Sequence, residues 1–295
     1  MIPPVASKFV AGETAGGALD HVAVLNRRNV SGILNLLGEH YHDPASAISD
    51  TNAYIELIDE IAATDVDACV SVKPSQIGLD MGDEEFEANL TKIADRGAER
   101  GVFVWVDMED HTTTDVTLDV FESLARRHDG GERSDGTRSS SDRWSDGGMG
   151  LCVQANLKRT REDLERLADV PGKVRLVKGA YDEPADVAYT EKERVDEVYR
   201  EHLEYMFEQF EDGIAIGSHD PAMIAHVRQL HRTHGTPYEV QMLMGVRTEA
   251  QYELASDDVT VYQYIPYGDR WMSYFYRRLR ERKENVLFAL RAIVS

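Results

Sequence analysis

The sequence predicts an α/β fold of the (β/α)8 TIM-type barrel class, and three observations lead to this prediction. Eight short β-rich runs recur along the chain, at residues 32–37, 68–72, 102–106, 150–155, 174–177, 214–216, 238–242 and 259–264. Runs such as Val-Phe-Val-Trp-Val are apolar on both faces, as buried parallel strands are. The segments between the runs are long enough for crossover helices. Eight such units favour a closed barrel over an open sheet.

The length of 295 residues allows two average domains, but a barrel of about 250 residues is routinely a single domain. We therefore expect one catalytic domain over residues 1–295. Residues 1–29 form a leader outside the repeat, with a helix expected at about 17–26 that packs on the barrel. Residues 126–148 are rich in Gly, Ser, Asp and Arg, which predicts a flexible insertion before the fourth strand. A lid is the alternative, but the insertion would lie at the end of the barrel opposite the usual site.

The charge balance disfavours a nucleic-acid partner, because 53 acidic residues against 32 basic ones give a net charge of -21. The acidic residues are spread along the chain, which indicates a solvated surface suited to high salt. Cys69 and Cys152 lack a C-x-x-C spacing, which fits a reducing cytoplasm rather than a disulfide or zinc framework. No run approaches the roughly 18 apolar residues of a membrane span. Residues 1–17 lack the features of a secretory signal, so a soluble, cytoplasmic protein is expected.

Polar side chains occur at or near the end of every predicted strand. They are Glu39, Lys73, Asp107, Gln154, Arg175 with Lys178, Ser218 with His219, Gln241 and Tyr264. One charged residue at a strand end is usually a solvated edge. Polar groups at all eight strands favour a site at the mouth of the barrel, where these ends converge.

The last predicted helix, at about 269–293, carries a second signal beside its apolar stripe. Tyr274, Arg277, Arg278 and Glu281 share one arc of its surface. Two neighbouring guanidinium groups are well matched to a carboxylate or a phosphate. A salt-bridged surface helix would show the same spacing, so both interpretations stay open on spacing alone.

A metal site and a dinucleotide-binding module are both disfavoured. His111 follows Asp107 and Glu109 closely, but barrel hydrolases with divalent metals typically carry a His-x-His pair at the end of the first strand. Here His40 and His42 lie past that end, so no metal is expected. The glycines form no G-x-G-x-x-G or phosphate-loop pattern, so no Rossmann module is implied.

Taken in order, these segments resemble the proline dehydrogenases, the flavoenzymes that open proline catabolism. The resemblance is carried by LLGE (36–39), SVKPSQIGL (71–79), VDMED (106–110), VQANL (153–157), RLVKGAY (175–181), GSHD (217–220), YEVQMLMG (238–245) and YIPYG with YRRL (264–268, 276–279). These motifs run through most of the chain. Their order and their placement at strand ends agree with the barrel predicted above.

The resemblance implies a reaction and a set of substrate contacts. FAD would bind non-covalently over the barrel mouth and accept hydride from the carbon next to the nitrogen of L-proline, which gives Δ1-pyrroline-5-carboxylate. The last helix would lie over the mouth, where Arg277, Arg278 and Lys73 bind the substrate carboxylate. The other substrate-binding positions implied are Glu39 and Glu281, which orient or gate the arginine pair, and Leu243, Tyr264 and Tyr274, which surround the ring.

The catalytic residues implied by the resemblance are Asp107, Arg175 and Lys73. Arg175 would lie near the reactive edge of the isoalloxazine, where positive charge stabilises the electron density that arrives with hydride. We expect Asp107 to be an organiser that pairs with Lys73 or Arg175 rather than a base. The cofactor-binding positions implied are Met108, Gln154, Arg175, Lys178, Gly179, Ala180, Ser218 and His219.

Departures and alternatives limit what the resemblance implies. Some relatives carry tryptophan where this chain has Asp182, which puts the packing around the adenine end of FAD in doubt. The alternatives are a methylenetetrahydrofolate reductase type of FAD barrel, which needs room for a pterin, and a barrel that binds without catalysis. The electron acceptor, expected to be a quinone or another acceptor, leaves no motif, so a peripheral membrane contact stays open. The oligomeric state and the preference between proline and hydroxyproline also stay open.

Replacing Arg278 tests the carboxylate clamp. We expect Arg278→Ala to weaken proline use by at least about 2 kcal/mol of transition-state binding, because a charge pair with the substrate is lost. The measurement is kcat/KM for L-proline, and an unchanged value would contradict the proposed contact.

Overall fold

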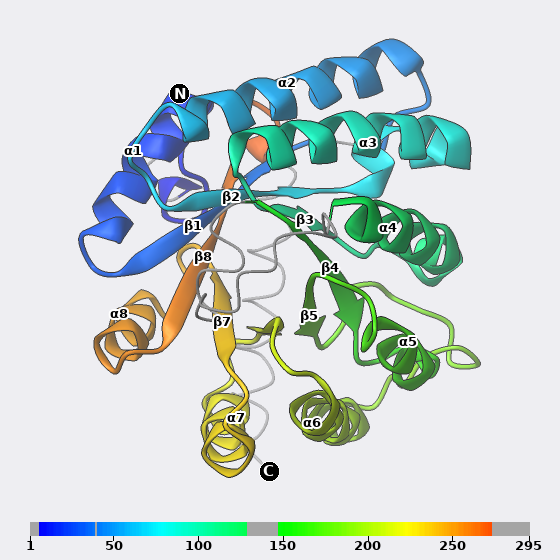
Figure 1. Cartoon of the computed structure of the whole chain (residues 1–295), viewed down its shortest axis with the longest axis vertical. Coiled ribbons are helices and arrows are strands. Elements are labelled where there is room, and N and C mark those ends of the chain that lie inside the picture. The colour runs from blue at the N-terminus through cyan, green and yellow to red at the C-terminus, as the bar shows by residue number, and fades with distance from the viewer. Residues whose placement is uncertain (1–5, 39, 129–146, 273–295) are drawn as a thin grey trace, which may run out of the picture.

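The computed structural model describes residues 6–38, 40–128 and 147–272, in which eight parallel strands close into a barrel (Figure 1). The strands are β1 (Val30–Leu36), β2 (Ala68–Val72), β3 (Val104–Val106), β4 (Met149–Gln154), β5 (Lys173–Val177), β6 (Ile214–Gly217), β7 (Tyr238–Leu243) and β8 (Thr260–Tyr267). β8 pairs with β1 from Val30↔Val261 to Leu36↔Tyr267, which closes the barrel. The predicted (β/α)8 class is confirmed.

Helices surround the strands on the outside of the barrel (Figure 1). They are α1 (Ala15–Asn26), α2 (Pro44–Ala62), α3 (Asp83–Arg100), α4 (Thr114–His128), α5 (Thr160–Leu167), α6 (Lys192–Gln209), α7 (Pro221–His234) and α8 (Thr248–Ser256). Their ends follow local chemistry. The Asp43 side chain accepts from Ser46 N at 2.9 Å, and Pro44 opens α2 with a preset φ. Asp220 caps α7 in the same way, at 2.9 Å from Ala222 N.

Two apolar regions hold the barrel together. The larger lies between the strands and the helices and includes Tyr54, Phe86 and Phe121, all of which are buried. The smaller comprises Ile33, Cys69, Phe103, Trp105 and Ala215, and Tyr262 and Tyr264 pack against it. Burial of each large apolar side chain contributes roughly 1.5–3 kcal/mol, so this packing fixes the strand ends that carry the site.

The segments that flank the barrel differ from the sequence prediction at their boundaries. Residues 126–128 are not part of an insertion but form the last turn of α4, where Arg126 donates to Glu122 at 2.9 Å. At the other boundary the Gly148 carbonyl accepts from Val104 N at 3.0 Å, so the approach to β4 is already paired with β3. Residues 129–146 lie outside the described residues.

The helix predicted in the leader is present, and only the start of the last predicted helix falls within the described residues. α1 begins at Ala15, where Thr14 caps it, and it packs against β1 and β8. Asp269 and Arg270 form a turn and Trp271 and Met272 are helical, while residues 273–293 of the last predicted helix, and with them its placement over the mouth, lie outside the described residues. Within the described ranges, no helix combines the length and the apolar character needed to cross a bilayer.

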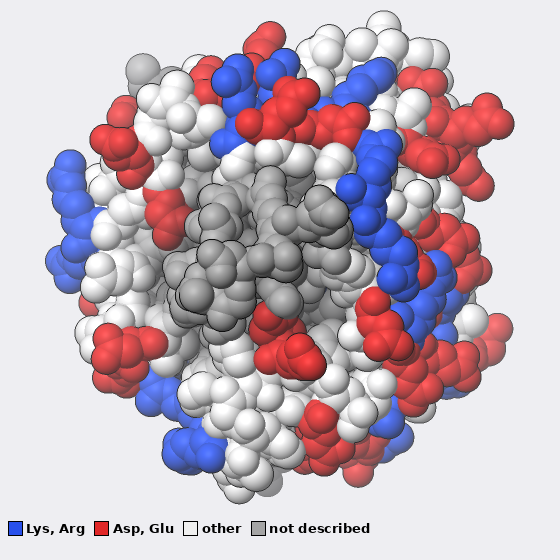
Figure 2. Space-filling model, viewed as in Figure 1, with Lys and Arg blue, Asp and Glu red and all other residues white. Residues whose placement is uncertain are grey.

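The surface is acidic, and many of its bases are already paired. Figure 2 shows Lys and Arg side chains along the side of α4 and α5 with Asp and Glu beside them. Arg159 contacts both Asp115 and Asp163, and Arg166 contacts both Asp119 and Glu122. Such pairs leave a large excess of acids, because the net charge is -21. Mutual repulsion of these acids opposes the compact state.

Salt should therefore stabilise the fold. We expect the Tm to rise between 0.1 and 1 M KCl, because the Debye length falls from about 10 Å to about 3 Å over this range. Chloride is used because sulfate stabilises proteins in general by exclusion from their surface. A Tm that stays constant or falls would refute the interpretation of the surface as salt-adapted.

A matched variant separates repulsion from other effects of salt. Glu208 and Glu211 are exposed acids near the C-terminal end of α6, where the helix dipole also disfavours negative charge. We expect Glu208→Gln/Glu211→Gln to raise the Tm at 0.1 M KCl and to change it little at 1 M.

Candidate active site

A cavity of about 870 Å³ opens at the C-terminal ends of the strands. Its volume falls within the roughly 300–1,000 Å³ of ligand and cofactor sites. Twelve of the predicted site residues line it: Lys73, Asp107, Met108, Gln154, Arg175, Lys178, Gly179, Ala180, Ser218, His219, Leu243 and Tyr264. The other predicted positions, Glu39, Tyr274, Arg277, Arg278 and Glu281, lie outside the described residues.

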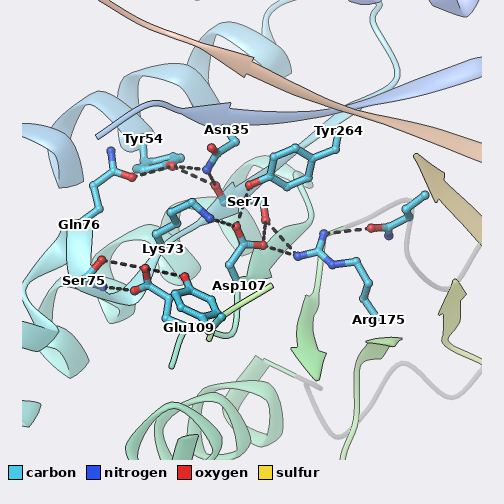
Figure 3. Close-up of polar contacts among 12 residues, drawn as sticks. Asn35, Tyr54, Ser71, Lys73, Ser75, Gln76, Asp107, Glu109, Arg175 and Tyr264 are labelled. Carbon is cyan, nitrogen blue, oxygen red and sulfur yellow. Dashed lines mark hydrogen bonds and ion pairs between the residues drawn. The ribbon is translucent and has the colours of Figure 1, made fainter. Parts of the chain in front are cut away.

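Asp107 lies at the centre of the polar groups in this cavity (Figure 3). Its Oδ2 accepts from Lys73 Nζ at 2.7 Å and from the Tyr264 hydroxyl at 2.7 Å. Its Oδ1 accepts from Ser71 Oγ at 2.8 Å and from the Arg175 guanidinium. Ser71 lies in β2 and Lys73 just after it, and Asp107 follows β3. Arg175 lies in β5 and Tyr264 in β8. The Asp107 carboxylate thus joins four parts of the barrel wall.

The ionisation of this cluster follows from its contacts. Burial by itself would raise the pKa of Asp107, but Lys73 and Arg175 outweigh it and hold that pKa well below its usual value. Burial would likewise lower the pKa of Lys73, and the neighbouring Asp107 reverses this and raises it. At neutral pH the carboxylate is therefore ionised and the ammonium is protonated.

The orientation of Arg175 is set on several sides, and the residue is only 4% exposed. Its guanidinium donates to Asp107 and, at 2.9 Å, to Gln241 Oε1. The Trp105 ring lies 4.8 Å from its central carbon, and the Tyr264 ring lies 5.7 Å away. These contacts place a fixed positive charge beside the cavity.

Glu109 is the centre of a second hydrogen-bond network, and no role in the site was predicted for it from the sequence. Its carboxylate accepts from Ser75 N at 2.6 Å, from Ser75 Oγ at 2.9 Å and from the Tyr181 hydroxyl at 3.4 Å (Figure 3). Its carbonyl accepts from Gln154 Nε2 at 2.7 Å, and Gln154 Oε1 accepts from Ala180 N at 3.2 Å. The loops after β2, β3, β4 and β5 are thereby tied together. The available signal was the position of Glu109 and Tyr181 inside two of the quoted motifs.

A polar network lies beside the C-terminal end of β1. The Tyr54 hydroxyl and Asn35 Nδ2 each donate to the Ser71 carbonyl at 2.9 Å. Gln76 lies against Gly38, where a Cβ would meet its side chain at 2.5 Å, so a larger residue at position 38 would displace the buried Gln76 side chain. Gly38 itself lines the cavity.

The turn after β5 also depends on glycine. Gly179 has φ of +120°, and a Cβ there would lie 2.1 Å from Asn156 Oδ1. This buried oxygen of Asn156 has no hydrogen-bond partner among the described residues. The turn is therefore held close to the β4 loop, with glycine and alanine exposed at the cavity.

Lys178 and His219 complete the far side of the mouth. Lys178 Nζ contacts Asp196 and, at 3.1 Å, Asp220, so its charge is shared between two carboxylates. His219 Nε2 lies 2.8 Å from Leu243 N, and because a backbone N–H only donates, this ring nitrogen is the acceptor. The predicted substrate position Leu243 and the predicted cofactor position His219 are therefore in contact.

His111, which raised the metal hypothesis, is engaged with an acid. Its Nδ1 lies 2.5 Å from Glu183 Oε2, and its backbone N donates to Glu183 Oε1 at 2.9 Å. In the ranges that the structure covers, no three His, Cys, Asp or Glu side chains gather in a way that could hold a metal ion.

A second cavity, of about 570 Å³, opens at the opposite end of the barrel. Its charged lining residues include Lys173, which pairs with Glu239 at 2.6 Å, and Arg100, which pairs with Asp59 at 2.7 Å. Both of these bases are thus paired with carboxylates of the protein itself. The mouth, where the predicted residues gather, is the candidate active site.

Comparison with known proteins gives consistent matches over nearly the whole chain. The family model described as "Proline dehydrogenase" matches residues 18–291. A curated "Proline dehydrogenase" of Deinococcus radiodurans is 34% identical over 99% of this chain and 90% of its own length. "Proline dehydrogenase 2" of Bacillus subtilis is 31% identical over 98% and 90%, respectively.

Solved structures share the fold. Proline utilization A (PutA) from Bdellovibrio bacteriovorus, whose structure is titled as inactivated by N-propargylglycine, matches with a TM-score of 0.80 and 25% identity over 93% of this chain. The chain spans only 32% of the length of that protein. PutA from Bradyrhizobium japonicum, at 23% identity and a TM-score of 0.71, supports the fold alone.

Removing the central carboxylate should destabilise the protein. We expect Asp107→Asn to lower the free energy of unfolding by about 3 kcal/mol at pH 7, because the buried Arg175 and the partly exposed Lys73 lose their counter-ion. The folded pKa of Asp107 lies below the unfolded value of about 3.9, so its contribution is present above that pH and is lost as pH falls toward the folded pKa. The difference between wild type and variant, measured by urea unfolding, should therefore shrink below pH 4.

Asp95→Asn is the control for this measurement. Asp95 pairs with Arg127 on the surface, where both side chains are about half exposed, at 47% and 48%. Loss of such a pair costs about 0–1 kcal/mol. Equal losses in the two variants would show that the Asp107 cluster adds nothing beyond a surface ion pair.

Proposed function

The chain belongs to the proline dehydrogenase family, and we propose that it oxidises L-proline to Δ1-pyrroline-5-carboxylate, the first step of proline catabolism, with FAD as the hydride acceptor. The observation that carries the proposal is the convergence of Lys73, Asp107 and Arg175 in the mouth of the barrel. This cluster offers fixed positive charge next to a cavity of cofactor size.

The residues at the mouth fit a flavin nucleotide. All eight positions that the family resemblance assigns to the cofactor line the same cavity of about 870 Å³. The turn at Gly179 and Ala180 is exposed to it, and Gly179 tolerates no side chain because of Asn156. The unpartnered buried oxygen of Asn156 next to this turn is an acceptor that the described residues leave unsatisfied.

When bound, FAD supplies a two-electron acceptor for the hydride that leaves proline. Arg175 would stabilise the negative charge that develops on reduction, since its guanidinium is charged and fixed. Its charge persists through the usual pH range, because the pKa of Arg175 is raised: burial alone would lower it, but the surrounding acidic side chains and hydrogen bonds more than offset that effect.

Lys73 would bind the substrate carboxylate. Its side chain is 31% exposed, against 9% for that of Asp107. The ammonium therefore reaches the cavity, while the more deeply buried Asp107 carboxylate pairs with it and fixes its position. Asp107 is then an organiser and not a base, because donors occupy both of its oxygens and its pKa is low. Arg277 and Arg278 would add the guanidinium groups of the clamp.

Tyr264 and Leu243 would lie beside the proline ring. The Tyr264 hydroxyl is directed at Asp107, which turns the ring of Tyr264 along the cavity wall. Leu243 has an apolar side chain, and its backbone N–H donates a hydrogen bond to His219. We propose that Tyr264 sets the discrimination between proline and hydroxyproline, and that a quinone or another acceptor reoxidises the flavin.

Anaerobic reduction tests the function directly. We expect L-proline to bleach the yellow absorbance of the purified protein loaded with FAD, because hydride transfer reduces the isoalloxazine. D-Proline is the matched control: it has the same groups with the opposite handedness, so a fixed clamp should present the wrong hydrogen to the flavin. Retention of full colour with L-proline would overturn the proposal.

A further inference from the structure

Polar side chains of β5 and β7 face each other inside the barrel, across β6. Lys173 and Arg175 alternate into the interior from β5, and Glu239 and Gln241 do so from β7. β6 lies between these strands, and Ala215 pairs with Arg175 on one side and Glu239 on the other. A residue as small as Ala215 leaves the long side chains of the two strands free to meet.

These four residues form one hydrogen-bonded chain. Lys173 Nζ contacts Glu239 Oε2 at 2.6 Å, Glu239 Oε1 accepts from Gln241 Nε2 at 2.7 Å, and Gln241 Oε1 accepts from Arg175 at 2.9 Å. Arg175 then donates to Asp107 in the mouth. All five residues are at most 9% exposed, so water competes little for these bonds.

The chemistry of the neighbours fixes the orientation of the Gln241 amide. A carboxylate only accepts, so Glu239 requires the NH2 group of Gln241. A guanidinium only donates, so Arg175 requires the oxygen. A flipped amide would lose both bonds, and Lys173 holds the Glu239 carboxylate in place by pairing with it at 2.6 Å.

We propose that Gln241 is a positioning residue that aims Arg175 at the flavin, and that the buried Lys173–Glu239 pair sets the direction of its amide. The proposal rests on the proposed function for the presence of the flavin. Gln241 and Asp107 hold the NH1 and NH2 ends of the guanidinium, so its plane is fixed from two sides. Gln241 has no charge of its own, so it adds no negative charge to that of Asp107 beside the guanidinium.

The reduction potential of the bound flavin tests this role, because it is measured at equilibrium without turnover. We expect Gln241→Leu to lower the midpoint potential, since a guanidinium released on one side stabilises reduced flavin less well. We expect kcat for L-proline to fall by roughly tenfold and KM to change by less than about twofold, because the substrate carboxylate clamp is untouched.

Gln263→Leu is the matched control. Gln263 is an equally buried glutamine in β8, but it bonds to His21 and Gln251 on the helix side of the strand, away from Arg175. It should lose stability as Gln241→Leu does and leave the flavin potential at the wild-type value. Equal potentials in wild type and Gln241→Leu, or the same shift in both variants, would overturn the proposal.

A double variant tests the Lys173–Glu239 part of this hydrogen-bonded series. It also provides a test if Gln241→Leu does not fold. Lys173→Met/Glu239→Gln removes both charges together, a change that buried ion pairs often tolerate. An amide at 239 accepts either orientation of Gln241, so we expect a potential below wild type but above that of Gln241→Leu. A wild-type potential would refute the role of the Lys173–Glu239 pair. Failure of L-proline to bleach the wild-type protein would instead contradict the proposed function.

Discussion

The site depends on a single carboxylate placed between two cations. Asp107 joins Lys73 and Arg175, and with Ser71 and Tyr264 it connects residues that lie in or just after β2, β3, β5 and β8. A closed barrel makes this possible, because it brings strand ends that are far apart in sequence to one mouth. The two cations in turn hold Asp107 ionised despite its burial, so each member of the cluster keeps the charge that the others require.

The sequence predicts much of this arrangement, because the signals involved are local. The expected range of β2, residues 68–72, agrees with the structure, and Lys73, Asp107 and Arg175 stand out in the sequence as polar residues at or near strand ends, while their catalytic roles are implied by the family resemblance. The strand signal was weaker where tertiary pairing decides. β8 continues to Tyr267, beyond the expected end at 264, because its whole length pairs with β1. Residues 126–128 share the polar, basic composition of the predicted insertion, but they continue the helix α4.

What could not be predicted are contacts between side chains from different strands. Glu109 is one acid among 53, and nothing in its spacing shows that it binds Ser75 across a neighbouring loop. Gln241 was noticed as a polar residue near a strand end, but its partner Arg175 is 66 positions away and its amide direction depends on Glu239. Such relations follow from the stagger of the strands, which no local pattern encodes.

The neutral amide at position 241 also has an electrostatic reason. A carboxylate there would hold Arg175 equally well by geometry, but with Asp107 it would place two negative charges on one guanidinium and cancel the field that faces the cavity. It would also lie beside Glu239, where two buried carboxylates could not both stay ionised at low cost. Glutamine avoids both effects: it provides an oxygen to Arg175 and an N–H to Glu239. The negative charge that orients the Gln241 amide belongs to Glu239, two residues earlier in β7 and further from the mouth, where it pairs with Lys173.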